Sequence, residues 1–259
     1  MNFRTILLAT AAVIAAGTAA NAAQVAALIG GDTIAIVDTE QKKATKSMKV
    51  TGIEGALVGI DVRPADNMLY GLVEDGTVVT IAMDGKATKK SKLETMLNKG
   101  VTATVDFNPV ADRLRVMGSD GMSLRANVDD GKVTKDGDHK YAETDMHKGE
   151  KPNVIAGAYT NAVKGAKETA LFNIDGTIGA LVKQAPPNDG TLNAVGKLGI
   201  TPKVVAFDIW SDGNGKNDAW LMADGTLYSV DLASGKATEA AKISGVSGAV
   251  TDIAILPAM

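Results

Sequence analysis

The chain has 259 residues, a formal net charge of −3, 4% aromatic residues and no cysteine. Without thiols it has no disulfides, no thiol catalysis and no thiolate metal sites. Its mild acidity, scattered lysines and few aromatic rings argue against nucleic-acid binding, which needs a basic face and stacking side chains.

Residues 1–22 have the pattern of a bacterial secretory signal, which is removed from the mature protein. A positive start at Arg4 is followed by an apolar stretch over residues 6–16 and by an A-x-A cleavage motif at residues 20–22. The apolar stretch is shorter than the about 20 residues that a membrane helix needs. We therefore expect cleavage between Ala22 and Ala23, a periplasmic or secreted mature chain, and no transmembrane segment in that mature chain.

Strand and turn signals repeat along the rest of the chain. Three copies, at Asp61, Asp106 and Asp208, read as an apolar-Asp-apolar strand, a polar turn, a second strand, an Asp-Gly turn, a third strand and a Gly-Lys-x-Thr phrase, and a fourth copy at Tyr159 is weaker. The copies, 44 to 53 residues apart, start at Asp61, Asp106, Tyr159, Asp208 and Asp252. A period of about 40 to 50 residues with several strands per unit is typical of a β-propeller.

The N-terminal unit lacks its first strand, and an equivalent strand ends the chain. The predicted units are residues 25–50 together with 249–256, then 57–94, 103–135, 154–198 and 204–243. If the last strand completes the first unit, the ring closes and leaves no open sheet edge. We predict an all-β, five-bladed β-propeller in a single domain over residues 23–259. A β-sandwich with coincidentally similar turns is the alternative.

Several phrases resemble a family of exported bacterial proteins known only as domain of unknown function 4394. They are residues 59–64 (GIDVRP), 106–116 (DFNPVADRLRV), 123–127 (SLRAN), 152–154 (PNV), 158–161 (AYTN) and 184–196 (QAPPNDGTLNAVG). The resemblance covers essentially the whole mature chain. It implies a propeller-like fold and export, and it implies no established activity, so no catalytic residue is carried over from it.

The predicted innermost strands carry an acidic side chain in four of the five units. These are Asp61, Asp106, Asp208 and Asp252, and Tyr159 interrupts the series. A ring of carboxylates around a narrow channel favours a hard cation such as Ca²⁺ or another divalent or trivalent ion, because these ions bind several oxygens. In the alternative interpretation, the aspartates only accept hydrogen bonds from neighbouring backbone.

A long connector, residues 136–153, is expected on the ligand-binding face together with the Asp-Gly turns. Those turns contain Asp75, Asp120, Asp175 and Asp224. The connector supplies Asp136 and Asp138 as candidate ligand-binding residues, and His139 and His147 as candidate metal ligands. Histidines among carboxylates suit Zn²⁺ or Cu²⁺. A solvated polar loop is the alternative.

The mature chain has four arginines, which are Arg63, Arg113, Arg115 and Arg125. We select the first three as ligand-binding candidates, since a planar guanidinium suits carboxylate or phosphate. Arg113 and Arg115 are expected on one strand face. A two-residue turn at Asp120-Gly121 would pair Arg125 with Val116 and point it to the other face. In the alternative interpretation, the arginines form ion pairs with Asp112 or Asp106 between blades.

Tyr159 and Asn161 complete the candidate ligand-binding residues. The chain has no G-x-S-x-G, H-E-x-x-H or phosphate-loop motif. We predict an extracytoplasmic binding or interaction module that takes a small ligand, a metal ion or a periplasmic protein. The alternatives are a carboxylate- or metal-dependent hydrolase or lyase for an envelope sugar or lactone, and a protein-interaction scaffold without a small ligand.

Overall fold

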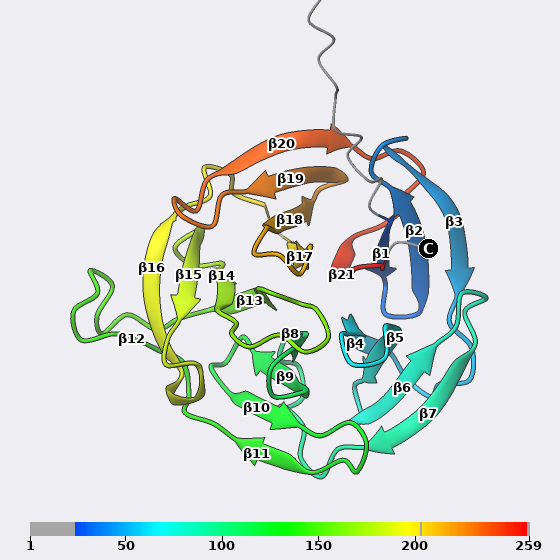
Figure 1. Ribbon diagram of the computed structural model, residues 1–259, viewed down its shortest axis with the longest axis horizontal. Helices are drawn as coiled ribbons and strands as arrows, with labels where there is room; N and C mark the ends of the chain where they lie inside the picture. Colours follow the sequence, from blue (N-terminus) through cyan, green and yellow to red (C-terminus); the bar gives the residue numbers. More distant parts are fainter. Residues whose placement is uncertain (1–23, 203, 258–259) are drawn as a thin grey trace, which may run out of the picture.

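The structure is a computed structural model that describes residues 24–202 and 204–257. The predicted signal segment therefore lies outside the described residues. In the described part, five sheets stand around a central axis, each with one strand at the centre and its other strands further out (Figure 1). The predicted five-bladed β-propeller is confirmed. No helix in this part of the chain is long and apolar enough to cross a membrane.

The blades are numbered here along the chain, and each is given from its innermost strand outward. Blade 1 contains β21 (Val250–Ile255), β1 (Gln24–Ile29), β2 (Thr33–Asp38) and β3 (Lys43–Lys49). Blade 2 contains β4 (Leu57–Arg63), β5 (Met68–Val73), β6 (Thr77–Ile81) and β7 (Ala87–Lys92). Blade 3 contains β8 (Ala103–Asn108), β9 (Arg113–Gly118), β10 (Ser123–Ala126) and β11 (Val133–Lys135).

The last two blades complete the ring. Blade 4 contains β13 (Val154–Tyr159), β14 (Leu171–Asp175), β15 (Ala180–Gln184), β16 (Thr191–Lys197) and β12 (Lys140–Tyr141), and the 3-10 helix η1 (Pro187–Asp189) precedes β16. Blade 5 contains β17 (Ala206–Ser211), β18 (Asn217–Ala223), β19 (Thr226–Val230) and β20 (Ala237–Lys242). The two ends of the described chain meet in blade 1, where β21 pairs antiparallel with β1.

The core lies between the blades rather than inside any one of them. The inner strands are buried on both faces: β1, for example, has four fully buried residues in its centre. The outer strands β3 and β7 carry exposed lysines instead. A sheet packed between two neighbours needs this two-sided apolar character at its centre. The pattern explains why the inner strands read as continuous apolar segments rather than alternating ones.

The connector between blades 3 and 4 contacts the Asp120-Gly121 turn, where the His139 amide donates to the Gly121 carbonyl. The connector's strand β12 pairs in parallel with β16 and adds a fifth strand at the outer edge of blade 4 (Figure 1). The pairing places Lys140 beside Thr191 and Tyr141 beside Leu192. The physical reason is that the free edge of β16 offers unpaired backbone groups, which the connector satisfies.

The orientation predicted for Arg125 is wrong. The turn between β9 and β10 has three residues rather than two, since the Gly118 amide donates to the carbonyl of Met122, and Gly121 has φ +103°. A left-handed residue at the end of a three-residue hairpin loop shifts the register by one position. Arg125 therefore lies opposite Arg115, and their side chains share a face of blade 3.

Candidate functional site

The innermost strands bring three aspartates together near the axis. Asp61 on β4, Asp106 on β8 and Asp208 on β17 are buried, and one carboxylate oxygen from each lies within 4.8 Å of the others. Within residues 24–202 and 204–257, no other three histidine or acidic side chains converge in this way. Asp252 on β21 is also buried but lies outside this group. We call Asp61, Asp106 and Asp208 the aspartate cluster.

Each inner-strand aspartate also joins two blades. Its carboxylate accepts a hydrogen bond from a backbone amide of the next inner strand. The pairs are Asp61 with Phe107 (2.6 Å), Asp106 with Tyr159 (3.0 Å), Asp208 with Ile255 (2.7 Å) and Asp252 with Ile60 (2.9 Å). The backbone role considered as the alternative is thus present at all four positions. These bonds hold the carboxylates in fixed orientations around the axis.

The joint between blades 4 and 5 is made differently. On β13, Ala158 packs in the apolar cluster shared with blade 5, while Tyr159 packs toward blade 3 and its hydroxyl accepts a hydrogen bond from Arg115 at 3.1 Å. Asn161 instead exchanges hydrogen bonds with Asn217, at 2.7 Å and 3.1 Å. The residue that replaces the missing aspartate is therefore Ala158, and Tyr159 and Asn161 serve as blade-to-blade contacts.

A cavity of about 330 Å³ opens above the aspartate cluster. Its lining includes the apolar side chains Pro64, Val163, Trp210 and Leu256, and the polar side chains Asn67, Lys164 and Ser211. Several of these follow directly on the first strand of a blade, in the turns that connect it to the second. The cavity thus opens on the face opposite to the Asp-Gly turns, because successive turns of an antiparallel blade alternate between faces. We predicted a ligand on the face that carries residues 136–153, and this cavity lies on the other face.

Burial dominates the electrostatics of the site. It raises the pKa of Asp61 and of Asp106 well above the ordinary value, and the repulsion from neighbouring carboxylates adds to it. Burial likewise raises the pKa of Asp208 to about 6 and that of Asp252 well above the ordinary value. Among the described residues, no lysine or arginine forms an ion pair with any of the four. Burial therefore favours the protonated form of these carboxyl groups, and a bound cation would favour their ionised form.

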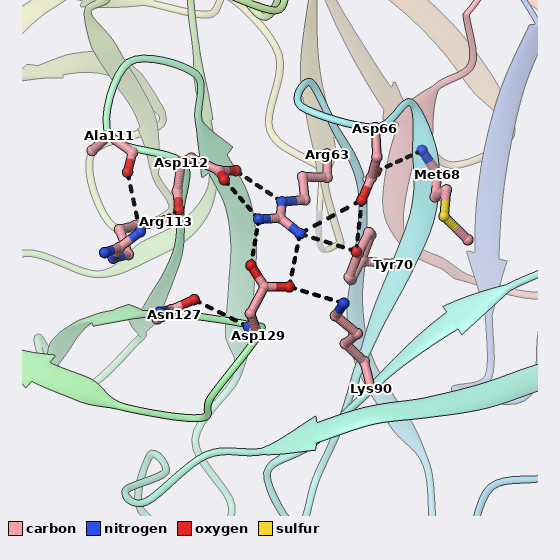
Figure 2. A network of polar contacts seen from close by, with 10 residues as sticks. All are labelled: Arg63, Asp66, Met68, Tyr70, Lys90, Ala111, Asp112, Arg113, Asn127 and Asp129. Atoms are coloured by element: carbon pink, nitrogen blue, oxygen red, sulfur yellow. Dashed lines mark hydrogen bonds and ion pairs between the residues drawn. The ribbon is translucent and has the colours of Figure 1, made fainter.

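Arg63 lies in a separate network that joins blades 2 and 3 (Figure 2). Its guanidinium donates to both carboxylate oxygens of Asp112, at 2.8 and 2.6 Å, and to both of Asp129, at 3.2 and 2.8 Å. It also donates to the Tyr70 hydroxyl. The Arg63 side chain is 8% exposed. These partners use the donors of Arg63 and agree with the ion-pair interpretation involving Asp112.

Arg115 forms a second buried network. Its guanidinium donates to Asp136 (2.5 Å), Ser123 (3.1 Å) and Asn188 (2.9 Å), in addition to Tyr159. Asp136 also accepts hydrogen bonds from Nε and Nη2 of Arg125, at 2.6 and 2.8 Å. One carboxylate therefore serves two guanidinium groups. Asp136, a ligand candidate from sequence, is 4% exposed and is occupied by these arginines.

The two histidines do not form one site. His139 is buried, and desolvation lowers its pKa to about 4; among the described residues, neither ring nitrogen has a hydrogen-bond partner. His147 Nδ1 instead lies 3.1 Å from a carboxylate oxygen of Glu150. Asp138 is mostly exposed, and its Oδ1 lies 3.6 Å from Nζ of Lys135. The structure thus gives these connector residues separate surroundings.

Sequence reasoning did not select Asn67, Lys164, Trp210 or Ser211, which line the cavity. Trp210 and Ser211 lie two and three positions after Asp208. Their nearness to the repeated aspartate is a signal that could have identified them. Asn67 and Lys164 lie in turns, and no repeat phrase marks their positions.

Two solved structures are similar to the chain at low sequence identity. A protein of unknown function from Bacteroides thetaiotaomicron VPI-5482 is 14% identical with a TM-score of 0.54, over 88% of this chain and 63% of its own. Another, from Bacteroides caccae, is 15% identical with a TM-score of 0.44, over 84% of this chain and 72% of its own. The first likeness shows the fold alone, and the second TM-score is too low to support an argument.

The family membership rests on the sequence itself. No curated protein matches the chain. The residue pattern described as "Domain of unknown function (DUF4394)" matches residues 33–254, which span all five blades. This match confirms the resemblance found in the phrases of the sequence. The chain therefore belongs to the DUF4394 family.

Proposed function

We propose that this protein is an extracytoplasmic binding module whose aspartate cluster holds a hard metal cation, Ca²⁺ or another divalent or trivalent ion. The observation that carries the proposal is the convergence of three buried carboxylates at the floor of a cavity without an ion-paired lysine or arginine. Hard cations prefer carboxylate oxygens. A cation would neutralise the cluster where protons otherwise must.

The cluster leaves part of the coordination shell open. Three carboxylates supply fewer oxygens than the about six to eight that Ca²⁺ takes, unless several bind through both oxygens. Asp106 supports coordination most directly: its Oδ1 accepts from the Tyr159 amide, and among the described residues its Oδ2 has no hydrogen-bond donor. The cavity above has room for water or for oxygen atoms of a ligand. A cation held here would therefore be reachable from solvent.

Thermal unfolding tests the proposal. The protein is first freed of metal with a chelator. Its melting temperature is then measured alone and with Ca²⁺, Mg²⁺, Zn²⁺, Cu²⁺ and a lanthanide in turn, at a pH above 6. A specific ion at a hundredfold excess over Kd stabilises by about 2.7 kcal/mol, which corresponds to roughly 5 to 10 °C in a domain of this size. Ca²⁺ or the lanthanide should give the largest shift.

Two isosteric variants separate the cluster from general charge effects. Asp106→Asn removes one proposed ligand and should abolish the shift. Asp252→Asn changes an equally buried aspartate that makes the same kind of blade joint outside the cluster, and it should keep the shift. No response to any ion, or an equal response in both variants, would sink the proposal.

One observation favours a second candidate, a carboxylate-dependent hydrolase or lyase. Asp208 lines the cavity, and its pKa of about 6 suits a general acid or base. Turnover on a panel of sugars and lactones, lost in Asp208→Asn, would support it. Absence of turnover across the panel, combined with ion binding, would leave the binding module as the better account.

A further inference from the structure

A second cavity, of about 370 Å³, lies on blade 3 away from the aspartate cluster. All the residues that line it have polar or charged side chains: Arg113, Arg125, Asn127, Asp130, Lys132 and Thr134. Three cationic side chains thus face a single carboxylate. The excess of positive charge distinguishes this cavity from the rest of a chain whose net charge is −3.

The two arginines are held in place but keep free donors. Arg125 is anchored by its Nε and Nη2 on Asp136, which leaves Nη1 without a partner among the described residues. Arg113 donates only through Nη1, to the carbonyls of Ala111 and Asp112, and forms no ion pair within the described residues. Figure 2 shows its guanidinium turned away from the Arg63 network. Anchored guanidinium groups with free donors suit the planar oxygens of an oxyanion.

Neutral donors complete the cavity. The Asn127 side-chain oxygen accepts from the Asp129 backbone amide, and its NH₂ group has no acceptor among the described residues. The Thr134 hydroxyl lies across the strand pair from Arg125. Lys132 is 76% exposed and lies 3.9 Å from Asp130, so its ammonium group is held only weakly. All these groups donate hydrogen bonds, whereas Asp130 alone contributes a negative charge.

Comparison with the other repeats shows that the arginines are additions to a common framework. The Gly-Lys-x-Thr phrase gives Lys132 the equivalents Lys86 in blade 2 and Lys236 in blade 5. By strand register, the positions of Arg113 and Arg125 are occupied by Met68 and Thr80 in blade 2, and by Asp218 and Ser229 in blade 5. The lysine therefore belongs to the repeat, and the paired arginines are particular to blade 3 among these three blades.

We propose that the blade 3 cavity is a second binding site, which takes an oxyanion (phosphate, sulfate or carboxylate) carried by a small molecule. Arg113 and Arg125 bind the oxyanion oxygens directly. Asn127 and Thr134 donate to the remaining oxygens, and Lys132 adds charge at the rim. The site is independent of the proposed cation site, since it shares no lining residue with that cavity.

Calorimetric titration tests this site with three probes: inorganic phosphate, sulfate and succinate. The protein is chelated first, so that no cation at the aspartate cluster holds the anion. At low ionic strength, at least one probe should bind saturably, and salt should weaken the binding. The preferred probe distinguishes a phosphate, sulfate or carboxylate ligand.

Matched variants identify the residues. Loss of a charge-assisted hydrogen bond in Arg113→Gln should weaken binding about tenfold or more. Asp130→Asn should tighten binding, because it removes the only carboxylate of the lining. Lys236→Gln, the repeat equivalent of Lys132→Gln in blade 5, should leave binding unchanged. Thermal unfolding of each variant verifies that it is folded.

Three outcomes would overturn the proposal. They are the absence of saturable binding for every probe, equal effects of Arg113→Gln and Lys236→Gln, and unchanged or weaker binding in Asp130→Asn. The second outcome would mean that the anion responds only to general surface charge.

Discussion

The carboxylate of Asp252 accepts a hydrogen bond from the backbone amide of Ile60 at 2.9 Å, and these two residues are 192 positions apart in the chain. The bond joins the last strand, β21, to the first strand of blade 2. On its other side, β21 pairs with β1 along most of its length. The C-terminal strand thus closes the ring twice, through a sheet within blade 1 and through a carboxylate between blades.

Removal of residues 250–257 should therefore abolish cooperative unfolding of the whole domain. The truncated chain loses the inner strand of blade 1 and exposes the backbone edge of β1. Circular dichroism during heating measures the effect, and a synthetic peptide of residues 249–257 should restore the transition. A truncated chain that melts cooperatively at the temperature of the full protein would contradict ring closure by β21.

The aspartate cluster should make the chelated protein less stable as the pH rises. Asp208 has a folded pKa of about 6, above its ordinary value of 3.8, so its favourable contribution is complete below 3.8 and is lost as the pH rises through 6. A shift of this size corresponds to about 3 kcal/mol. In denaturant unfolding between pH 4 and 8, the stability of Asp208→Asn relative to the parent protein should increase as the pH rises. A constant difference between the two would refute the raised pKa.

His139 should change the pH dependence of folding stability in the opposite direction to Asp208, over an overlapping pH range. Its folded pKa of about 4 lies below the ordinary 6.5, so the unfolded chain binds the proton more tightly. The contribution of His139 is complete above 6.5 and decreases toward pH 4, by on the order of 3 kcal/mol. His139→Leu should therefore lack this loss of stability. Its free energy of unfolding should increase relative to that of the parent protein as the pH falls. A stability difference between His139→Leu and the parent protein that does not increase toward low pH would contradict a buried neutral imidazole.

Arg115 should be the most sensitive of the arginines. It is fully buried and donates to four side chains from four segments of the chain. Arg115→Met removes the Arg115 donor from Tyr159, Ser123 and Asn188 and leaves Asp136 with Arg125 as its one guanidinium partner among the described residues, so it should cost about 3 to 5 kcal/mol. The partly buried Arg113 is the matched comparison, and Arg113→Met should change stability by less than about 0.5 kcal/mol. Equal losses in chemical denaturation would contradict this ranking.

The repeat made the architecture predictable from sequence. The spacing of Asp61, Asp106, Asp208 and Asp252 placed the inner strands, and the missing first strand of the N-terminal unit indicated closure by the C-terminus. Such features are legible because each blade reuses the same local turn chemistry. The fifth strand of blade 4 was not predictable in this way, because β12 has only two residues and lies outside the repeat.

The side-chain surroundings were harder to predict. A difference of one residue in the loop after β9 reversed the expected face of Arg125, and local sequence does not distinguish the two loop lengths at an Asp-Gly pair. The opening of the cavity on the opposite face was missed, since it depends on which turns remain uncovered around the axis. The substitution of Ala158 at the aspartate position was hidden because the neighbouring Tyr159 matches the repeat spacing.

Direct measurement of ion stoichiometry tests the central proposal most sharply. Ca²⁺ and a lanthanide are titrated calorimetrically into the chelated protein, and the metal content is determined after dialysis. The account predicts one ion per chain in the parent protein and in Asp252→Asn, none in Asp106→Asn, and tighter binding as the pH rises because the ion displaces protons from the cluster. An Asp106→Asn variant that binds as well as the parent, or a parent protein that binds no ion, would contradict it.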